Sequence, residues 1–319
     1  MRRMLCGALA LMMSISFAAF ADCKDNNTSE SGSGANGGVS ASTGLEQSGN
    51  SSAGENQFVN HSNLLTYFEN ATGKVSLTAV MNMNIKTVSS VSDLCLGGES
   101  VEEITVDGQG RYTLKVTGYG GGIIKANNGG TLILKNLDIE NESGSMEDSS
   151  TGFRAMYADF GGKTRFENCD IYGALQIHGD ADVEFVGCNF YSQEQDMYAI
   201  WMTQGKALFK DCTFTGYRAI KLYEGSDHYT SLLDVYDVES VTVDGCTFRD
   251  ISKKPGLAID FMDEGESAVV IKDSFFLNCQ DVKTGAVGVN GIYESRTQAA
   301  MDTVTIENVN VDGMPYGEE

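Results

Sequence analysis

Three aromatic residues in the middle of the chain are suited to stacking on a sugar ring. They are Tyr157, Trp201 and Tyr223, and Trp201 is the only tryptophan in the protein. The face of an aromatic ring packs against apolar C–H groups, while a phenol O–H or an indole N–H hydrogen-bonds to neighbouring polar groups. If Trp201 faces solvent, this set predicts glycan binding. The alternative is that a loop covers Trp201.

Carboxylates gather in the following segment of the chain. The clearest candidates are Glu224, Asp260 and Asp263, with Asp227, Asp234 and Asp237 in the loop between them. Hard oxygen ligands at this density are what Ca²⁺ prefers, so a calcium site is one hypothesis. The other is a set of solvated surface carboxylates, which is the default in a chain with a formal net charge of −22.

A repeat of apolar residues must position all of these side chains. The apolar residues are spaced i, i+2, i+5 and i+7, and seven copies begin at Leu132, Thr164, Val183, Ala207, Val241, Val269 and Val304. A step of two keeps side chains on one face of a strand, so the step of three predicts a corner. The residue at i+4 is Asn, Asp or Gly, the types that adopt positive φ most readily. Each copy therefore predicts strand, one-residue bend, strand.

A second alternating run precedes each later copy of the repeat. These runs are Ala155–Asp159, Ala174–His178, Ala199–Thr203, Ala219–Tyr223, Ala258–Met262 and Ala286–Asn290, and residues 124–127 play the same part before the first copy. Each unit then contains three short strands, and units recur every 19 to 35 residues with the length differences in loops. Stacked in parallel, such units form a β-helix, so the predicted fold is all-β.

Alternation within the second runs predicts two outward columns of side chains. One column holds Lys125, Tyr157, Gln176, Trp201, Lys221, Asp260 and Gly288, and the other holds Asn127, Asp159, His178, Thr203, Tyr223, Met262 and Asn290. We predict that ligand binding uses this face, through Tyr157, Gln176, Trp201, Asp159 and Asp260. The predicted ligand is a polysaccharide or a cell-surface glycan.

Taken together, the three-strand units over residues 75 to 311 resemble the right-handed parallel β-helix, or pectate-lyase-like, superfamily. The resemblance implies a right-handed solenoid whose open N-terminal end is covered by a short capping helix, for which residues 62–70 are the candidate. It also implies that the outward face of the strands formed by these second runs floors the substrate groove in the superfamily's enzymes.

The resemblance further suggests a catalytic group. Uronate lyases of the superfamily use Arg or Lys as the base, often beside Ca²⁺, and here Arg218 or Lys221 would be the base with His178 or Tyr223 as the acid. Acidic residues predicted beside Lys221 favour its charged ammonium and oppose this role. The polygalacturonase-like branch fits less well, because the chain has no adjacent Asp-Asp pair. A polysaccharide lyase or glycoside hydrolase is therefore the alternative function, and the sequence leaves open whether the chain is an enzyme.

Four cysteines occupy the same slot of successive repeats, namely Cys169, Cys188, Cys212 and Cys246. In-register parallel strands keep their Cβ atoms about as far apart as the strands, which is long for a disulfide. We predict a column of free buried thiols, with cysteine acting as a compact apolar filler.

Residues 1–21 have the basic start, apolar run and small-x-small ending of a signal peptide. Residues 22–57 are rich in Ser, Gly and Asn and predict a flexible linker, and residues 58–319 are the predicted β-helix domain. Cys23 is either the acylated cysteine of a lipoprotein, which would be the chain's only membrane contact, or a spare thiol. The acidic charge opposes nucleic-acid binding. We predict an exported or cell-surface protein, secreted, periplasmic or lipid-anchored, that binds glycan or another surface without catalysis.

Overall fold

The computed structural model describes residues 57–59, 72–87, 94–96, 101–118, 124–126, 130–143, 156–159, 163–173, 175–178, 182–191, 200–202, 205–216, 233–236, 239–251, 257–261, 268–279, 288–289, 292–296 and 304–315. Every regular element in these residues is a β-strand. The capping helix expected over residues 62–70, the predicted signal peptide and nearly all of the predicted linker lie outside the described residues. The all-β parallel solenoid predicted from the repeat is confirmed.

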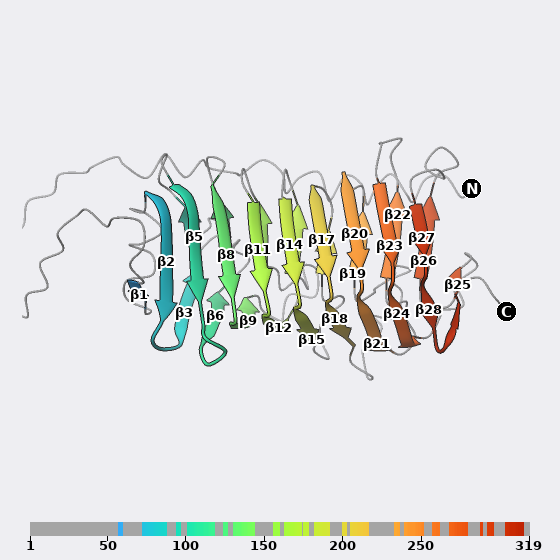
Figure 1. Cartoon of the computed structure of the whole chain (residues 1–319), viewed down its shortest axis with the longest axis horizontal. Helices are drawn as coiled ribbons and strands as arrows, with labels where there is room; N and C mark the ends of the chain where they lie inside the picture. Colours follow the sequence, from blue (N-terminus) through green and yellow to red (C-terminus); the bar gives the residue numbers. More distant parts are fainter. Residues whose placement is uncertain are drawn as a thin grey trace, which may run out of the picture. The chain divides into compact units, whose positions relative to one another are not determined.

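Sheet A contains the first strand of each repeat copy and runs in the order β1-β2-β5-β8-β11-β14-β17-β20-β23-β27 (Figure 1). Its strands are all parallel. Their bounds are β1 Gln57–Val59, β2 Gly73–Ala79, β5 Val101–Asp107, β8 Thr131–Lys135, β11 Lys163–Glu167, β14 Asp182–Val186, β17 Lys206–Lys210, β20 Ser240–Asp244, β23 Ala268–Lys272 and β27 Val304–Glu307.

Sheet B contains the strand that follows each corner and runs in the order β29-β28-β24-β21-β18-β15-β12-β9-β6-β3. The strands are β3 Met83–Thr87, β6 Thr113–Gly118, β9 Asp138–Ser143, β12 Asp170–Tyr172, β15 Asn189–Tyr191, β18 Thr213–Thr215, β21 Thr247–Ile251, β24 Phe275–Cys279, β28 Asn310–Val311 and β29 Met314–Pro315. Only β29 is antiparallel to its neighbour. Because Pro315 has no N–H, this folded-back edge strand is a poor template for adding another chain.

Sheet D contains the third strand of each unit and runs in the order β10-β13-β16-β19-β22-β26-β25. The strands are β10 Met156–Asp159, β13 Leu175–His178, β16 Ile200–Met202, β19 Leu233–Tyr236, β22 Leu257–Phe261, β25 Gly288–Val289 and β26 Ile292–Arg296. A two-stranded sheet, β4 Leu94–Leu96 with β7 Ile124–Ala126, takes the corresponding place in the earlier units.

The corner residues of the repeat have the backbone conformation that the sequence predicts. All seven have positive φ, from 50° at Asp273 and Asn308 to 67° at Gly245. Neighbouring corners also contact one another: the Asn308 side-chain amide donates to the Asp273 carboxylate at 2.5 Å. Where glycine occupies the corner, it leaves room for its neighbour, since a Cβ at Gly187 would lie 2.7 Å from the Asn168 Oδ1 atom.

A second set of corners, which the repeat does not predict, lies within one residue of the ends of the last strands of sheet B. Asp250, Asn278 and Asp312 have φ values of 60°, 54° and 48°. The Asn278 amide donates to Asp250 at 3.1 Å, and the Asn278 N–H donates to Asp312 at 2.6 Å. These turns redirect the chain at the C-terminal units, where Asp312 precedes the fold-back into β29.

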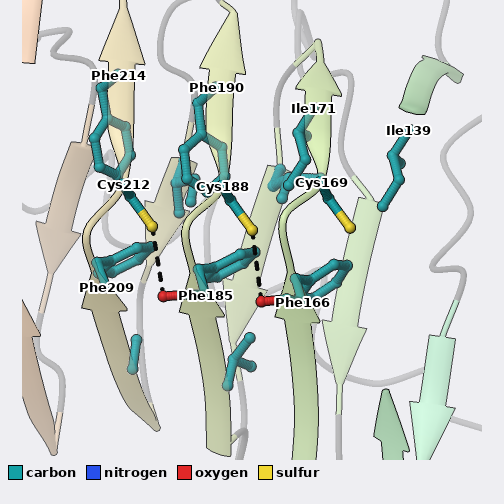
Figure 2. Close-up of a cluster of buried hydrophobic side chains, with 14 of the residues drawn as sticks. Ile139, Phe166, Cys169, Ile171, Phe185, Cys188, Phe190, Phe209, Cys212 and Phe214 are labelled. Atoms are coloured by element: carbon teal, nitrogen blue, oxygen red, sulfur yellow. Dashed lines mark hydrogen bonds between the residues drawn. The ribbon is translucent and has the colours of Figure 1, made fainter. Parts of the chain in front are cut away.

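Phenylalanine side chains stack along the core in two columns (Figure 2). Phe166, Phe185 and Phe209 come from sheet A, with ring centroids 4.7 and 5.1 Å apart. Phe190, Phe214, Phe248 and Phe276 come from sheet B, with spacings of 4.5, 4.5 and 4.7 Å. The spacing matches that of parallel strands, so each in-register strand adds one ring to its column.

The predicted thiol column lies between these aromatic columns. Cys169, Cys188, Cys212 and Cys246 are free and almost fully buried. Each S–H donates to a carbonyl of the preceding unit, as in Cys188 to Phe166 at 3.5 Å and Cys212 to Phe185 at 3.4 Å (Figure 2). The prediction of free, buried thiols is confirmed.

Ionisation of three thiols of the column, Cys169, Cys188 and Cys212, is opposed by their surroundings. The neighbouring Cys188 sulfur and burial raise the pKa of Cys169, and Cys188, Cys246 and burial raise that of Cys212. Contacts with Cys169 and Cys212 favour a lower pKa for Cys188. However, the Cys188 S–H donates to the Phe166 carbonyl, and a thiolate would lose this hydrogen bond and be repelled by the carbonyl oxygen. We therefore expect the thiols of Cys169, Cys188 and Cys212 to remain protonated.

In the folded protein the column thiols should not react with a soluble thiol reagent. We expect reaction only after denaturant is added, because a reagent needs an accessible thiolate. A colorimetric thiol count of a Cys23→Ser/Cys95→Ser variant, with and without denaturant, measures this. Rapid modification of the folded variant would contradict the burial of the column.

Asp107, at the end of β5, has a lowered pKa. Burial alone would raise it, but the Asn136 amide and the Gln109 N–H donate to its Oδ1 atom at 3.0 and 2.8 Å. Lys135 adds an ammonium 3.4 Å from Oδ2. The ionised carboxylate therefore stabilises the folded state above the ordinary aspartate pKa, and this contribution is lost as pH falls through the lowered value.

Asp138, at the start of β9, has a raised pKa because of partial burial, then the nearby charges of Asp170 and Glu140. Its ionised form weakens the folded state once pH exceeds the raised value, and the effect is absent below the pKa of a free aspartate.

Substitution of these two aspartates by asparagine should have opposite effects. At neutral pH, Asp107→Asn is expected to lower the urea midpoint and Asp138→Asn to raise it. Both differences should shrink in acid below about pH 3.9, where a free aspartate is protonated. Shifts of the same sign at neutral pH would contradict the assignment.

Candidate ligand-binding face

Sheet D positions the predicted ligand-binding residues. Its strands pair in register, so Tyr157, Gln176, Trp201 and Asp234 are level with one another on β10, β13, β16 and β19. In β16, Trp201 lies between Ile200 and Met202, whose side chains are fully buried. Because successive residues of a strand alternate between faces, position 201 falls on the outer face of the sheet. The backbone thus brings Tyr157, Gln176 and Trp201 into one outward column, as predicted.

The column continues through different residues from those expected. The prediction that Ala219–Tyr223 forms the strand after β16 is wrong, because β19 at Leu233–Tyr236 pairs with β16. Asp234, rather than Lys221, is therefore level with Trp201. Arg218, Lys221, Tyr223 and Glu224 lie outside the described residues, and so does Asp263.

A constant connection length identifies the correct strand. Three residues separate sheet D from sheet A in successive units, between β10 and β11, β13 and β14, β16 and β17, and β19 and β20. The run 219–223 would have needed a far longer connection to β20. Leu233 and Val235 also supply the two apolar positions that pair with Ile200 and Met202.

Asp260 also occupies a different column from the one predicted. Asp260 pairs with Tyr236, which follows Val235, and Val235 is level with Met202 and Ile177. Asp260 is therefore level with His178 rather than with Trp201. A slip of two residues keeps a side chain on the same face and moves it to the next column. Asp159, His178 and Asp260 therefore share the second outward column, together with Tyr236.

The last unit of the sheet differs as well. The prediction that Ala286–Asn290 forms the parallel strand of this unit is wrong. Gly288–Val289 is an antiparallel edge strand, and Ile292–Arg296 continues the parallel stack. Tyr293 then pairs with Ala258, which pairs with Asp234. The column that begins with Tyr157 ends with another tyrosine, which the sequence analysis missed.

The calcium hypothesis rests mostly on residues beyond the described part of the chain. Of its three candidates, only Asp260 lies within a described strand, β22. Within the described residues, no group of three or more His, Cys, Asp or Glu side chains is arranged to hold a metal ion.

The same residues contain no helix long and apolar enough to span a membrane.

Comparison with protein families agrees with this architecture. Residues 154–317, about half of the chain, match the family model described as a right-handed β-helix region. The chain therefore belongs to the right-handed β-helix family. No curated protein matches the chain.

Proposed function

We propose that this chain is an exported β-helix protein that binds a polysaccharide or cell-surface glycan through the outward face of sheet D. The observation that carries the proposal is the in-register column of Tyr157, Gln176 and Trp201 on adjacent strands. Aromatic residues at this spacing supply stacking surface, and the amide supplies a hydrogen-bonding group beside it. Export is supported by the signal-peptide pattern of residues 1–21 and by the Ser/Gly/Asn-rich stretch that follows it.

Binding is favoured over catalysis because β19 is the strand that pairs with β16, which puts Asp234 rather than Lys221 level with Trp201. Of the suggested catalytic residues, His178 lies in β13. The strand assignment also removes the reason for placing Lys221 beside Trp201. Asp159, His178 and Asp260 share a column, and their role in the proposal is to contact hydroxyl groups of the ligand.

A glycan titration followed by tryptophan emission tests the proposal. Trp201 is the only tryptophan, so any emission change reports on its own surroundings. We expect a saturable change with at least one member of a panel of neutral and uronate-containing polysaccharides. Trp201→Ala should weaken binding, measured by calorimetry, by about twofold to tenfold, the value of one aromatic contact. Leu208→Ala, on the outward face of sheet A, is the matched control and should bind normally.

Two outcomes would count against this function. Binding that is equally strong in the Trp201→Ala variant would move the site away from sheet D. Release of unsaturated products or new reducing ends from the same panel would replace binding by the lyase or hydrolase alternative.

A further inference from the structure

The outward face of sheet B changes character along the solenoid. Between β15 and β24 its outward positions form two in-register rows, which we together call the sheet B platform. One row runs from Asn189 through Thr213 and Thr247 to Phe275, and the other runs from Tyr191 through Thr215 and Arg249 to Leu277. Apart from the ends of the rows and Arg249, the platform side chains are all threonines.

The platform lacks carboxylates in a strongly acidic protein. Its only charged side chain is Arg249, whose Nε donates to the Thr215 hydroxyl at 3.1 Å. Sheet A is different in the same units, since β14, β17, β20 and β23 all carry charged outward residues. Several of these are paired, as in Lys163–Glu184 at 2.6 Å, Lys206–Glu239 at 2.8 Å and Lys272–Asp244 at 3.1 Å. Loss of charge on one face only is typical of a surface that meets a ligand.

Apolar side chains are left open at one end of the platform. Phe275 is 48% exposed and Leu277 is 39% exposed, although both belong to a strand whose alternate residue, Phe276, is fully buried. The in-register neighbours of Phe275 are Thr247 and Asn310, which are too short to cover a phenyl ring. Adjacent exposed apolar residues of this kind mark binding sites more often than isolated ones do.

An aromatic stack bounds the other end of the platform. The Tyr191 ring stacks on Tyr172 with centroids 4.8 Å apart and an interplanar angle of 13°. On the other side of Tyr191, the in-register neighbour is Thr215, whose short side chain provides no second ring to stack on. Burial and then the nearby Asp170 raise the pKa of Tyr191, so its phenol remains a hydrogen-bond donor. Rings at both ends and hydroxyl groups between them suit a ligand with alternating C–H and O–H surfaces.

We propose that the sheet B platform binds an uncharged polysaccharide chain lying across its strands, at a site separate from the sheet D face. The net charge of −22 repels polyanions, which favours an uncharged ligand. A protein partner fits less well, because a stable protein interface uses roughly 20 to 30 residues on each side, far more than the platform offers. A polymer with a short repeat can instead contact the same residue types on successive strands.

The experiment measures retention of the full chain on cellulose, chitin and mannan, with affinity derived from depletion of the soluble protein. The unaltered protein should bind at least one matrix. Phe275→Ala and Arg249→Ala should each weaken this binding by threefold or more, whereas Phe275→Tyr, which keeps the ring, should preserve it. Circular dichroism would verify that the variants fold, as expected for changes at exposed positions.

Control variants separate this site from the sheet D face. Leu208→Ala should keep binding to the matrix that retains the unaltered protein, and Phe275→Ala should cause the same fold loss whether or not Trp201→Ala is also present. The inference is overturned if no uncharged matrix retains the protein, if retention survives both platform substitutions, or if it is lost in Trp201→Ala alone. It is also overturned if sedimentation shows a dimer that Phe275→Ala dissociates, because the platform would then be an interface between copies. None of these results depends on Trp201 emission, which tests the sheet D proposal by itself.

Discussion

Phe209→Ala is expected to lower the free energy of unfolding by about 3–5 kcal/mol, the usual loss for a large aromatic side chain in a closed core. Phe209 is fully buried and contacts both aromatic columns. Its ring stacks on Phe185 at 5.1 Å and meets Phe214 edge-on at 5.7 Å. The units on either side of Phe209 fix the strand spacing, so the cavity left by the alanine cannot close along the aromatic column.

Denaturant unfolding of the full chain measures this loss. Leu208→Ala is the control, because Leu208 adjoins Phe209 in β17 but lies on the outward face and is only partly buried. We expect the control to lose much less stability than Phe209→Ala. Equal losses for the two neighbours would mean that the aromatic columns contribute no more than the surface does.

Gly187→Ala should produce the second large effect, through the backbone of a corner. Gly187 has a φ of 64°, a conformation that costs about 1–2 kcal/mol for an L-residue with a Cβ. The added Cβ would also lie 2.7 Å from the Asn168 Oδ1 atom in the corner of the preceding unit. Forcing such a contact in a packed site costs about 1–3 kcal/mol more.

Two further variants separate these contributions. Gly110 has the same φ of 64°, but a Cβ added there would have no atom within 4 Å, so Gly110→Ala measures the conformational cost alone. Asn168→Gly combined with Gly187→Ala removes the obstructing side chain and should recover the additional loss. If Gly187→Ala and Gly110→Ala have the same unfolding free energy, neighbouring corners do not constrain one another.

The corners were predictable because their cause is local. A step of three in an alternating pattern, with Asn, Asp or Gly beside it, has one simple backbone solution, a residue with positive φ. The core columns follow from the same pattern, since in-register parallel strands place equivalent residues together. Asn136 and Gly187 show this directly, as both adopt the bend that their residue types allow.

Strand choice in sheet D was less predictable because several apolar runs compete for the same place. The segments around Lys221 and around Asp234 both alternate apolar and polar residues, and only the connection to β20 separates them. Asp260 shows a related ambiguity, since Leu257 and Ile259 or Ile259 and Phe261 could face the core with the same alternation. Local pattern fixes the face, whereas pairing with the neighbouring strand fixes the column.

The sheet B platform was missed for a different reason. Its outward residues come from strands whose inward residues were used only to define the repeat. Exposure of Phe275 and Leu277 follows from the short neighbours that the register places beside them. A sequence pattern without that register does not show which large side chains remain uncovered.

The placement of Trp201 beside Asp234 is the central claim, because the whole sheet D face follows from it. Nitroxide labels on a Trp201→Cys/Asp234→Cys variant and on a Trp201→Cys/Lys221→Cys variant, each with Cys23 and Cys95 changed to serine, measure it through dipolar broadening of their spectra. Positions on paired strands are about 4.8 Å apart. We predict strong broadening for the 201/234 pair, well above that of the singly labelled chains. Broadening for the 201/221 pair with none for the 201/234 pair would contradict the register and the ligand-binding face built on it.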